Sequence, residues 1–280
     1  EGITFSCSTN VGIDISVDEL NQKFDAVCLA GGSTVPRDLP IDGRELDGVH
    51  FAMDFLSQQN RWNEDSQKVS ITAKNKNVVV IGGGDTGADC LGTSIRQGAK
   101  KITQIEIMPQ PPKSRENKNP WPEWPMILRT SSAHEEGGER EYSVMTKHFE
   151  GNGRVQKLIC EKVEWVDNPE TGRADLKPIE NSTFEIKSEL VLLAMGFVHP
   201  LQEGLLKDLS VEFDNRGNVK TDNNLMTNIN GVFSCGDMQR GQSLVVHAIA
   251  SGRTCAKKID LFLEGKSNLP DVKGYFRNKK

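Results

Sequence analysis

The central part of the chain alternates apolar runs with polar segments in the order expected for parallel strands joined by a helix. The run Val78–Ile81 is continuously apolar and predicts a strand buried on both faces. The mixed segment 88–97 that follows is compatible with a helix, and Gly98 marks its end. The apolar segment 102–107 predicts the next strand. This pattern indicates a strand–turn–helix–strand unit of the βαβ type.

The turn between the first strand and the helix is Gly82-Gly83-Gly84-Asp85-Thr86-Gly87, which matches the G-x-G-x-x-G fingerprint of dinucleotide-binding units. In that fingerprint Gly82 forms the tight turn, Gly84 lets backbone approach a pyrophosphate, and Gly87 lets the helix pack against the strand. The N–H groups at the start of the helix then face the phosphates. A glycine-rich turn without a ligand is the alternative. We expect residues 82–87 to bind a nicotinamide nucleotide.

An acidic residue, Glu106, lies near the end of the second strand, about 24 positions after Gly82. A carboxylate at this position hydrogen-bonds the ribose 2′-hydroxyl of NAD and repels a 2′-phosphate. The alternative is an exposed polar residue at a strand end. Lys113 and Arg115 follow closely and are within reach of a 2′-phosphate. Glu106 therefore favours NAD(H), and NADP(H) stays possible.

Three further extended segments, 141–149, 157–166 and 184–193, are separated by turn signals. They predict a β-meander attached to the βαβ unit. The segment 108–125 before them holds half of the twelve prolines and two of the four tryptophans, so it predicts an ordered loop pinned by Trp121 and Trp124. This loop either covers a cofactor, faces a partner or simply packs on the surface. Residues 66–195 are assigned to one NAD(P)-binding domain.

Two segments on either side of the fingerprint, 25–36 and 189–200, carry an acid, an apolar strand, an alanine, a glycine and a proline at identical offsets. Each predicts a buried strand, a glycine turn and a proline exit. We interpret the two segments as a repeat. The alternative is that they are two unrelated strand–turn units. We assign the flanks, 1–65 and 196–280, to a second domain. Its helices are predicted at 48–60 and 244–263.

The carboxyl-terminal flank contains a second strand–glycine motif. A short apolar strand from Gly231 ends in Gly236-Asp237, and a loop then leads to the helix near Leu244. Glycine permits close approach of a ligand, and the carboxylate can reach a hydroxyl group. The start of the helix, at Gln242, Ser243, Leu244 and Val245, would lie against an electron-rich ring or an anion. A simple turn is the alternative for Gly-Asp in isolation.

Composition excludes several classes of function. The chain has 280 residues, a net charge of −5 and a pI of about 5.7, and it carries no basic stripe for nucleic acid. It has no apolar run long enough for a membrane span, and an acidic balance gives no attraction to membranes. Six cysteines lie about 20 or more positions apart, so they form no CxxC pair and no local metal or iron–sulfur run. Cys28, Cys160 and Cys255 are expected to be reduced core residues, as in a reducing compartment.

Taken together, these motifs resemble a known family. The segments 105–112, 119–125, 194–197 and 236–246 are similar to the small subunit, or carboxyl-terminal region, of glutamate synthase. The resemblance covers nearly the whole chain. It implies an α/β fold with two nested Rossmann-like domains, in which an NAD(P)-binding domain is inserted into an incomplete FAD domain.

The resemblance also implies an activity: hydride transfer from NAD(P)H to FAD, with electrons passed onward for the synthesis of L-glutamate from L-glutamine and 2-oxoglutarate. The implied partner is the large subunit or domain, which carries FMN and iron–sulfur clusters. The residues implied to contact the nicotinamide nucleotide or FAD are Gly82, Gly83, Gly84, Asp85, Thr86, Gly87, Glu106, Gly196, Gly236, Asp237, Gln242, Ser243, Leu244 and Val245. The resemblance implies a cytoplasmic location, with an organelle as the alternative.

The chain departs from the family pattern at its amino terminus. The family's FAD-binding G-x-G-x-x-G and its cysteine-rich iron–sulfur segment lie upstream of this region, and the chain begins with Glu1 instead of methionine, so we expect a fragment of a longer protein. No side-chain acid, nucleophile or metal is required for hydride transfer, and His134 and His247 are interpreted as structural. The alternatives are another NAD(P)H:ferredoxin-type flavoprotein, similar to the corresponding region of dihydropyrimidine dehydrogenase, and a non-catalytic module that keeps the fold.

Overall fold

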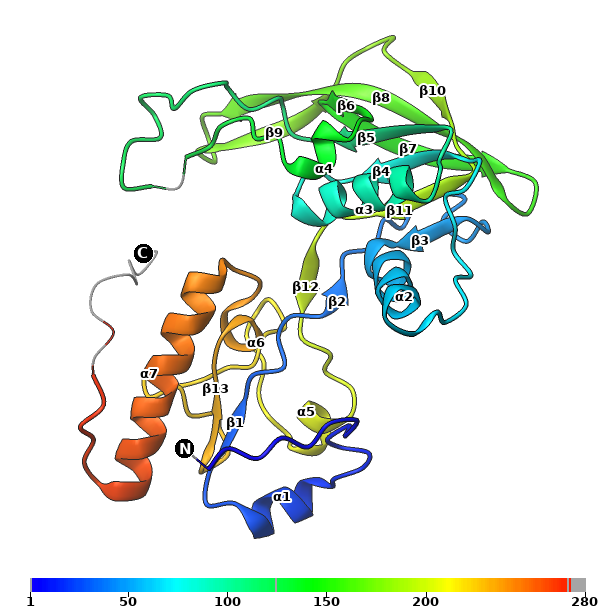
Figure 1. Ribbon diagram of the computed structural model, residues 1–280. Coiled ribbons are helices and arrows are strands. Elements are labelled where there is room, and N and C mark those ends of the chain that lie inside the picture. The colour runs from blue at the N-terminus through cyan, green and yellow to red at the C-terminus, as the bar shows by residue number, and fades with distance from the viewer. Residues whose placement is uncertain (1, 124, 271, 273–280) are drawn as a thin grey trace. The chain divides into compact units, whose positions relative to one another are not determined.

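The computed structural model describes residues 2–123, 125–270 and 272, and it divides the chain into two compact units (Figure 1). Unit 1 is formed by both ends of the chain, up to Pro36 and from Phe197 onward. Unit 2 is the continuous segment Arg37–Gly196. One unit is therefore inserted into the other, and the predicted nested α/β architecture is confirmed.

Unit 2 is built on a five-stranded parallel sheet with the order β3-β11-β4-β5-β6. Its strands are β3 (Val49–Phe51), β4 (Asn77–Ile81), β5 (Lys101–Glu106), β6 (Glu139–Tyr142) and β11 (Leu190–Leu193). Its helices are α2 (Ala52–Asp65), α3 (Asp85–Arg96) and the single turn α4 (Ser132–Glu135). The apolar strand and helix predicted around the fingerprint are β4 and α3, so that prediction is confirmed.

The central strand β4 is covered on both faces, as its continuous apolar sequence requires. Val78 and Val80 pack with residues of α2 and α3 in one hydrophobic core. Val79 and Ile81 pack on the opposite face against residues of the antiparallel sheet. Each such side chain contributes roughly 1.5–3 kcal/mol by leaving water. Helices, parallel sheet and antiparallel sheet thus form three layers that hold the end of β4 in place.

The predicted meander is an antiparallel sheet made of β7 (Val144–Gly151), β8 (Val155–Asn168), β9 (Arg173–Pro178) and β10 (Phe184–Lys187). The third extended segment, predicted as one strand over 184–193, is two strands in two different sheets. The chain turns at Ser188, whose buried hydroxyl donates to Leu190 O at 2.8 Å. Residues after this corner enter the parallel sheet as β11.

The structure draws the first domain boundary at Pro36/Arg37, whereas we placed it at residue 65. The helix predicted to start at Gly48 begins at Ala52, because Val49–Phe51 forms β3 and pairs with β11. Phe55 of the following helix is fully buried in the core of unit 2. Residues 37–65 therefore pack with the inserted unit.

Unit 1 has two separate two-stranded sheets. It contains β1 (Val27–Leu29), β2 (Val35–Pro36), β12 (Phe197–His199) and β13 (Val232–Ser234), together with the helices α1 (Val17–Lys23), α5 (Leu205–Asp208), α6 (Asp237–Arg240) and α7 (Val245–Glu264). Strands β1 and β13 pair in parallel, and β2 pairs antiparallel with β12. The first repeat provides β1 and β2, and the second provides β11 and β12. Strand β11 is fully buried, as predicted, whereas β1 is only partly buried and Cys28 on it is exposed. No helix in the described part of the chain combines the length and apolarity needed to cross a membrane.

Candidate functional site

Packing alone requires glycine at two positions of the loop after β4. Gly82 has a φ of 126°, and a Cβ there would overlap the Ala194 carbonyl oxygen at the end of β11. A Cβ on Gly87 would overlap the Gly82 carbonyl oxygen, because α3 lies directly against the turn. The first and last glycines of the fingerprint therefore close the turn and dock the helix.

Gly84 differs from these two glycines because space is open around it. A Cβ added to Gly84 would meet no atom within 4 Å, although its φ of −82° suits any residue. Gly84 is the N-cap of α3, and no side chain caps this helix. The first N–H groups of an α-helix, here at 85–87, have no acceptor within the helix. This end of α3 therefore presents donors and open space, which is what a pyrophosphate needs.

Glu106 at the end of β5 holds the same loop. Its Oε2 accepts a hydrogen bond from Gly83 N at 2.6 Å, and its Oε1 accepts one from Met108 N at 3.1 Å. A carboxylate has about four acceptor positions, so it keeps capacity for a ligand hydroxyl. Glu106 therefore ties the end of β5 to the loop after β4.

A half-buried chain of hydrogen bonds that we did not predict also holds this loop. Ser131 N donates to His134 Nδ1, so the ring proton is on Nε2, which lies 2.9 Å from Gln104 Oε1. The amide nitrogen of Gln104 in turn donates to Gly82 O at 2.8 Å. The signal in the sequence is a polar residue inside the apolar strand 102–107, since a buried amide requires partners. His134 is structural, as interpreted, and it acts on the loop through Gln104.

Burial lowers the pKa of His134, and the nearby Arg140 guanidinium lowers it further. The imidazole is therefore neutral at neutral pH. This is the state that the chain of hydrogen bonds requires, because Nδ1 must accept the Ser131 N–H.

Hydrogen bonds hold the described part of the loop 108–125, and Trp121 does not. Trp121 is 83% exposed, so it does not pin the loop, and Trp124 lies outside the described residues. Arg115 donates to the carbonyl oxygens of Asn119 and Glu123 at 2.9 and 3.0 Å. Its guanidinium is therefore engaged within the loop itself.

The second candidate site lies in unit 1, where β13 leads into α6. Gly236 has a φ of 66° and its N–H donates to Ser251 Oγ of α7 at 3.0 Å. Asp237 Oδ1 accepts a hydrogen bond from Ser243 Oγ at 2.8 Å, and Gln242 Nε2 donates to Phe197 O at 2.7 Å. Residues 236–243 thus form a hydrogen-bonded loop between β13 and α7.

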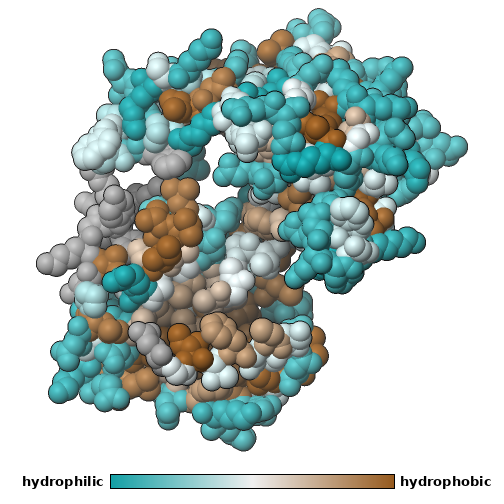
Figure 2. All heavy atoms as spheres, in the orientation of Figure 1, coloured by the Kyte–Doolittle hydropathy of each residue, from teal (hydrophilic) through white to brown (hydrophobic). Residues whose placement is uncertain are grey.

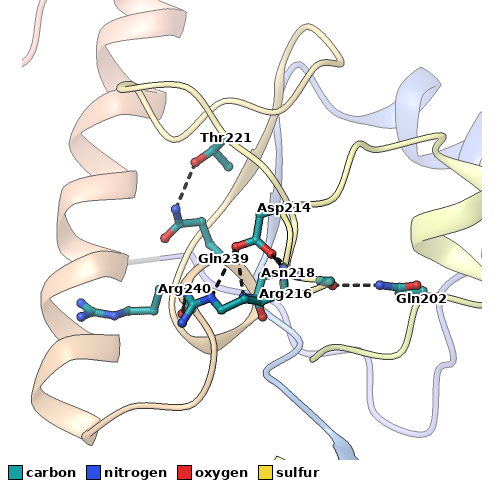
Figure 3. Close-up of polar contacts among 8 residues, drawn as sticks. Gln202, Asp214, Arg216, Asn218, Thr221, Gln239 and Arg240 are labelled. Carbon is teal, nitrogen blue, oxygen red and sulfur yellow. Dashed lines mark hydrogen bonds and ion pairs between the residues drawn. The ribbon is translucent and has the colours of Figure 1, made fainter. Parts of the chain in front are cut away.

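A polar network joins α6 to the segment 214–221 (Figure 3). Arg216 donates to Arg240 O at 2.8 Å, and Gln239 donates to Thr221 Oγ1 at 3.2 Å. Burial opposes ionisation of Asp214, but donation from the backbone N–H groups of Asn218 and Arg216 outweighs it and lowers the pKa of that carboxyl. The charged Asp214 therefore fixes the turn that carries Arg216.

The start of α7 exposes apolar side chains. Val245 is 74% and Ile249 is 59% exposed, and Leu244 and Val246 are also exposed. Figure 2 shows these apolar residues gathered over the amino-terminal end of the helix. A helix start that is apolar and accessible suits a flat aromatic ligand or an apolar surface.

The predicted site residues fall into two groups. Residues 82–87 and Glu106 lie together in unit 2, and Gly196, with a φ of 80° and open surroundings, ends that unit. Gly236, Asp237 and residues 242–245 lie together in unit 1. Their roles in binding stay predictions.

Comparison with known proteins agrees with this architecture. The chain is 52% identical over 96% of its length to the glutamate synthase [NADPH] small chain of Mycobacterium tuberculosis, of which it covers 56%. It is 45% identical over 96% of its length to glutamate synthase [NADH] of Schizosaccharomyces pombe, of which it covers 13%. The chain thus spans about half of the small chain and a minor part of the yeast protein. The resemblance inferred from its motifs is confirmed.

Solved structures share the fold at low sequence identity. The structure of Mycobacterium tuberculosis FprA in complex with NADPH matches 91% of this chain with a TM-score of 0.67 and 17% identity, and 67% of that protein is covered. Thioredoxin reductase of T. acidophilum matches 86% of this chain with a TM-score of 0.54 and 21% identity, and 66% of it is covered. The family model for pyridine nucleotide-disulphide oxidoreductases matches residues 4–252, and the chain belongs to that family.

Proposed function

We propose that this chain is the NAD(P)H-oxidising flavoprotein module of a glutamate synthase. The observation that carries the proposal is the open surface around Gly84 at the uncapped start of α3, framed by two glycines that packing requires. The 52% identity to a glutamate synthase small chain supports it. When bound, NAD(P)H supplies a hydride and FAD accepts it and passes electrons onward for L-glutamate synthesis. The protein contributes binding and orientation.

The residues present fit a nicotinamide nucleotide. Gly84 leaves room for a pyrophosphate, the 85–87 N–H groups are suitable donors, and Glu106 has capacity for a ribose hydroxyl. In unit 1, Gly236, Asp237 and the apolar start of α7 fit part of FAD. Among the described residues of unit 1, no glycine-rich strand–turn–helix forms a pyrophosphate site. We therefore propose that this chain alone binds NADH weakly and retains little or no FAD.

We further propose that NADH is preferred to NADPH, because the Glu106 carboxylate would repel a 2′-phosphate and Arg115 is engaged elsewhere. The relatives are named with either coenzyme. The test is kcat/KM for both coenzymes in the full-length enzyme, repeated with Glu106→Gln. We expect a higher value for NADH and a reduced preference in the variant. A tenfold preference of the unmodified enzyme for NADPH, about 1.4 kcal/mol, would refute the assignment.

The proposed partner is the large subunit or domain of glutamate synthase, which carries FMN and iron–sulfur clusters. The free cysteines fit a reducing compartment, the cytoplasm or an organelle. The decisive experiment is an absorbance spectrum of the full-length protein with and without NADH, followed by an assay for L-glutamate from L-glutamine and 2-oxoglutarate. Flavin that is reduced without glutamate formation would indicate another ferredoxin-type flavoprotein. Flavin that neither coenzyme reduces would indicate a non-catalytic module.

A further inference from the structure

Three cysteines that are remote in sequence meet in unit 1. Cys28 lies on β1, Cys235 follows β13, and Cys255 lies on α7. The Cys28 sulfur lies 3.7 Å from the sulfur of Cys235 and 3.7 Å from that of Cys255, and all three sulfurs lie within 4.8 Å of one another. Cys235 and Cys255 are buried, whereas Cys28 is exposed, which differs from our expectation that it belongs to the core. The three thiols therefore form a cluster that solvent can reach at Cys28.

The spacing of the three sulfurs matches that of a metal–thiolate site. A Zn–S bond of about 2.3 Å in tetrahedral geometry places two sulfurs about 3.8 Å apart. Two of the three sulfur–sulfur distances are already 3.7 Å. A disulfide requires sulfurs about 2.05 Å apart, so none is formed in this arrangement. We propose that Cys28, Cys235 and Cys255 form a three-thiolate site for a soft metal ion such as Zn²⁺, with its fourth position open to solvent or an added ligand.

The surroundings of the cluster favour the same assignment. The hydrophobic core around Cys235 and Cys255 consists of Phe233 with the partly buried Ala26, Leu225, Met226 and Ile259. Thiolates are the ligands that soft ions select, and an apolar shell excludes water from the metal–sulfur bonds. Each coordinating thiol gives up its proton to solvent when the metal binds.

Metal binding at this point would also join distant parts of the chain. Cys28 belongs to the segment before the inserted unit, whereas Cys235 and Cys255 belong to the segment after it. A shared metal fixes β1, β13 and α7 to one another. Because the folded arrangement binds the ion more strongly than the unfolded chain, the ion stabilises unit 1.

The test uses the full chain, purified under reducing conditions and freed of metal. Zn²⁺ is titrated in competition with a chromophoric chelator, and thermal unfolding is recorded with and without Zn²⁺. We expect one Zn²⁺ per chain and a higher Tm. Cys28→Ser should weaken the affinity by about 100-fold or more, since it removes a direct ligand. Cys7→Ser and Cys160→Ser, an exposed and a buried cysteine outside the cluster, are matched controls and should leave the affinity unchanged.

A second measurement does not depend on substitution. Co²⁺ in place of Zn²⁺ gives sulfur-to-cobalt charge-transfer absorption whose intensity rises with the number of thiolates, and we expect the intensity of three. Cys28 is exposed, so Cys28→Ser should keep the metal-free Tm of the unmodified protein. Absence of stoichiometric binding, unchanged affinity in Cys28→Ser, or a cobalt spectrum without thiolate bands would overturn the proposal. So would a disulfide between any two of the three cysteines in the freshly isolated protein.

Discussion

The two glycine turns of this molecule have similar local structure, but the sheets that carry them differ greatly in size. Gly82 and Gly236 both follow a buried strand, adopt a positive φ and precede a helix. The strand before Gly82 is central in a five-stranded sheet with a hydrophobic core on each face. The strand before Gly236 has a single parallel neighbour among the described residues. A turn motif in the sequence therefore does not reveal how firmly the fold holds it.

The difference lies in what fixes each turn. The turn in unit 2 is fixed sterically, because added atoms at Gly82 or Gly87 would overlap backbone. The turn in unit 1 is fixed by hydrogen bonds from Gly236 and to Asp237, and a Cβ on Gly236 would meet only Ala248 Cβ at 3.9 Å. We conclude that the glycine turn of unit 2, the proposed nucleotide site, is preorganised by the core of its own unit. The site in unit 1 depends on polar contacts that are easier to disturb.

Of the substitutions that compare the two turns, Gly82→Ala should have the largest effect on stability. The new methyl group would overlap Ala194 O in a backbone conformation that alanine avoids, so the free energy of unfolding should fall by about 3 kcal/mol or more. The control is Gly98→Ala, where φ is 84° but nothing lies within 4 Å, with a cost of about 1 kcal/mol. Urea unfolding of both variants checks this. Equal losses would show that steric closure at Gly82 is unimportant.

Gly84→Ala tests the open part of the same turn. Because this position is unstrained and uncrowded, the free energy of unfolding should change by less than about 0.5 kcal/mol. The methyl group occupies the space proposed for the pyrophosphate, so NADH affinity should fall about 100-fold, or about 2.7 kcal/mol. Gly252→Ala on α7, also an uncrowded glycine, should leave NADH affinity unchanged. Unaltered NADH binding in Gly84→Ala would argue against the proposed site.

Asp237→Ala tests the turn of unit 1 in the flavin-loaded, full-length protein. Loss of the carboxylate removes the acceptor for Ser243 and the proposed flavin contact, so flavin affinity should fall about tenfold. The free energy of unfolding of unit 2, measured in urea, should not change. Asp208→Ala, an exposed acid of the same unit, is the control. If the variant keeps as much flavin after gel filtration as the unmodified protein, Asp237 does not bind flavin and only stabilises the turn.

The smallest expected effect is on pH dependence. The pKa of His134 is lowered from 6.5, so the unfolded chain binds its proton first as pH falls. The stability contributed by the neutral ring is complete above pH 6.5 and is lost as pH decreases from there toward the lowered value. His50, whose pKa burial also lowers, acts in the same direction. Tm measured from pH 7.5 to 5 should therefore fall less steeply in His134→Gln. An identical slope would exclude a role for the His134 hydrogen bonds.

The sequence allowed confident prediction only where the information is local. The strand, fingerprint, helix and second strand were predicted because an apolar run and glycine spacing act over a few residues. Val49–Phe51 was wrongly predicted as helix, because its strand partner Val191–Leu193 is far away in the chain. The corner at Ser188 and the exposure of Trp121 were missed for a similar reason, since neither apolar patterning nor composition encodes which neighbours are present.

The candidate site shows the same limit. The glycines and Glu106 were identifiable by position, and the structure joins Glu106 to Gly83 directly. The contribution of Gln104 and His134 depends on α4 and β5 packing together, although a glutamine inside an apolar strand was a usable signal. The thiol cluster had no signal at all, because most of the chain separates Cys28 from Cys235 and Cys255. The three become neighbours only when β1, β13 and α7 assemble.

The inserted unit also has a consequence for chain topology. Its first and last residues are hydrogen-bonded, with Arg37 N donating to Gly196 O at 2.9 Å, and the adjoining β2 and β12 pair with each other. The two ends of the insertion are therefore adjacent in unit 1, as the ends of a short hairpin loop are. The loss of chain entropy on joining them is correspondingly small. The inserted unit is thus a separable part of the chain. Exchange of Arg37–Gly196 for an equivalent unit, or for a tight turn, leaves the host connection geometrically intact, as in tolerated domain insertions.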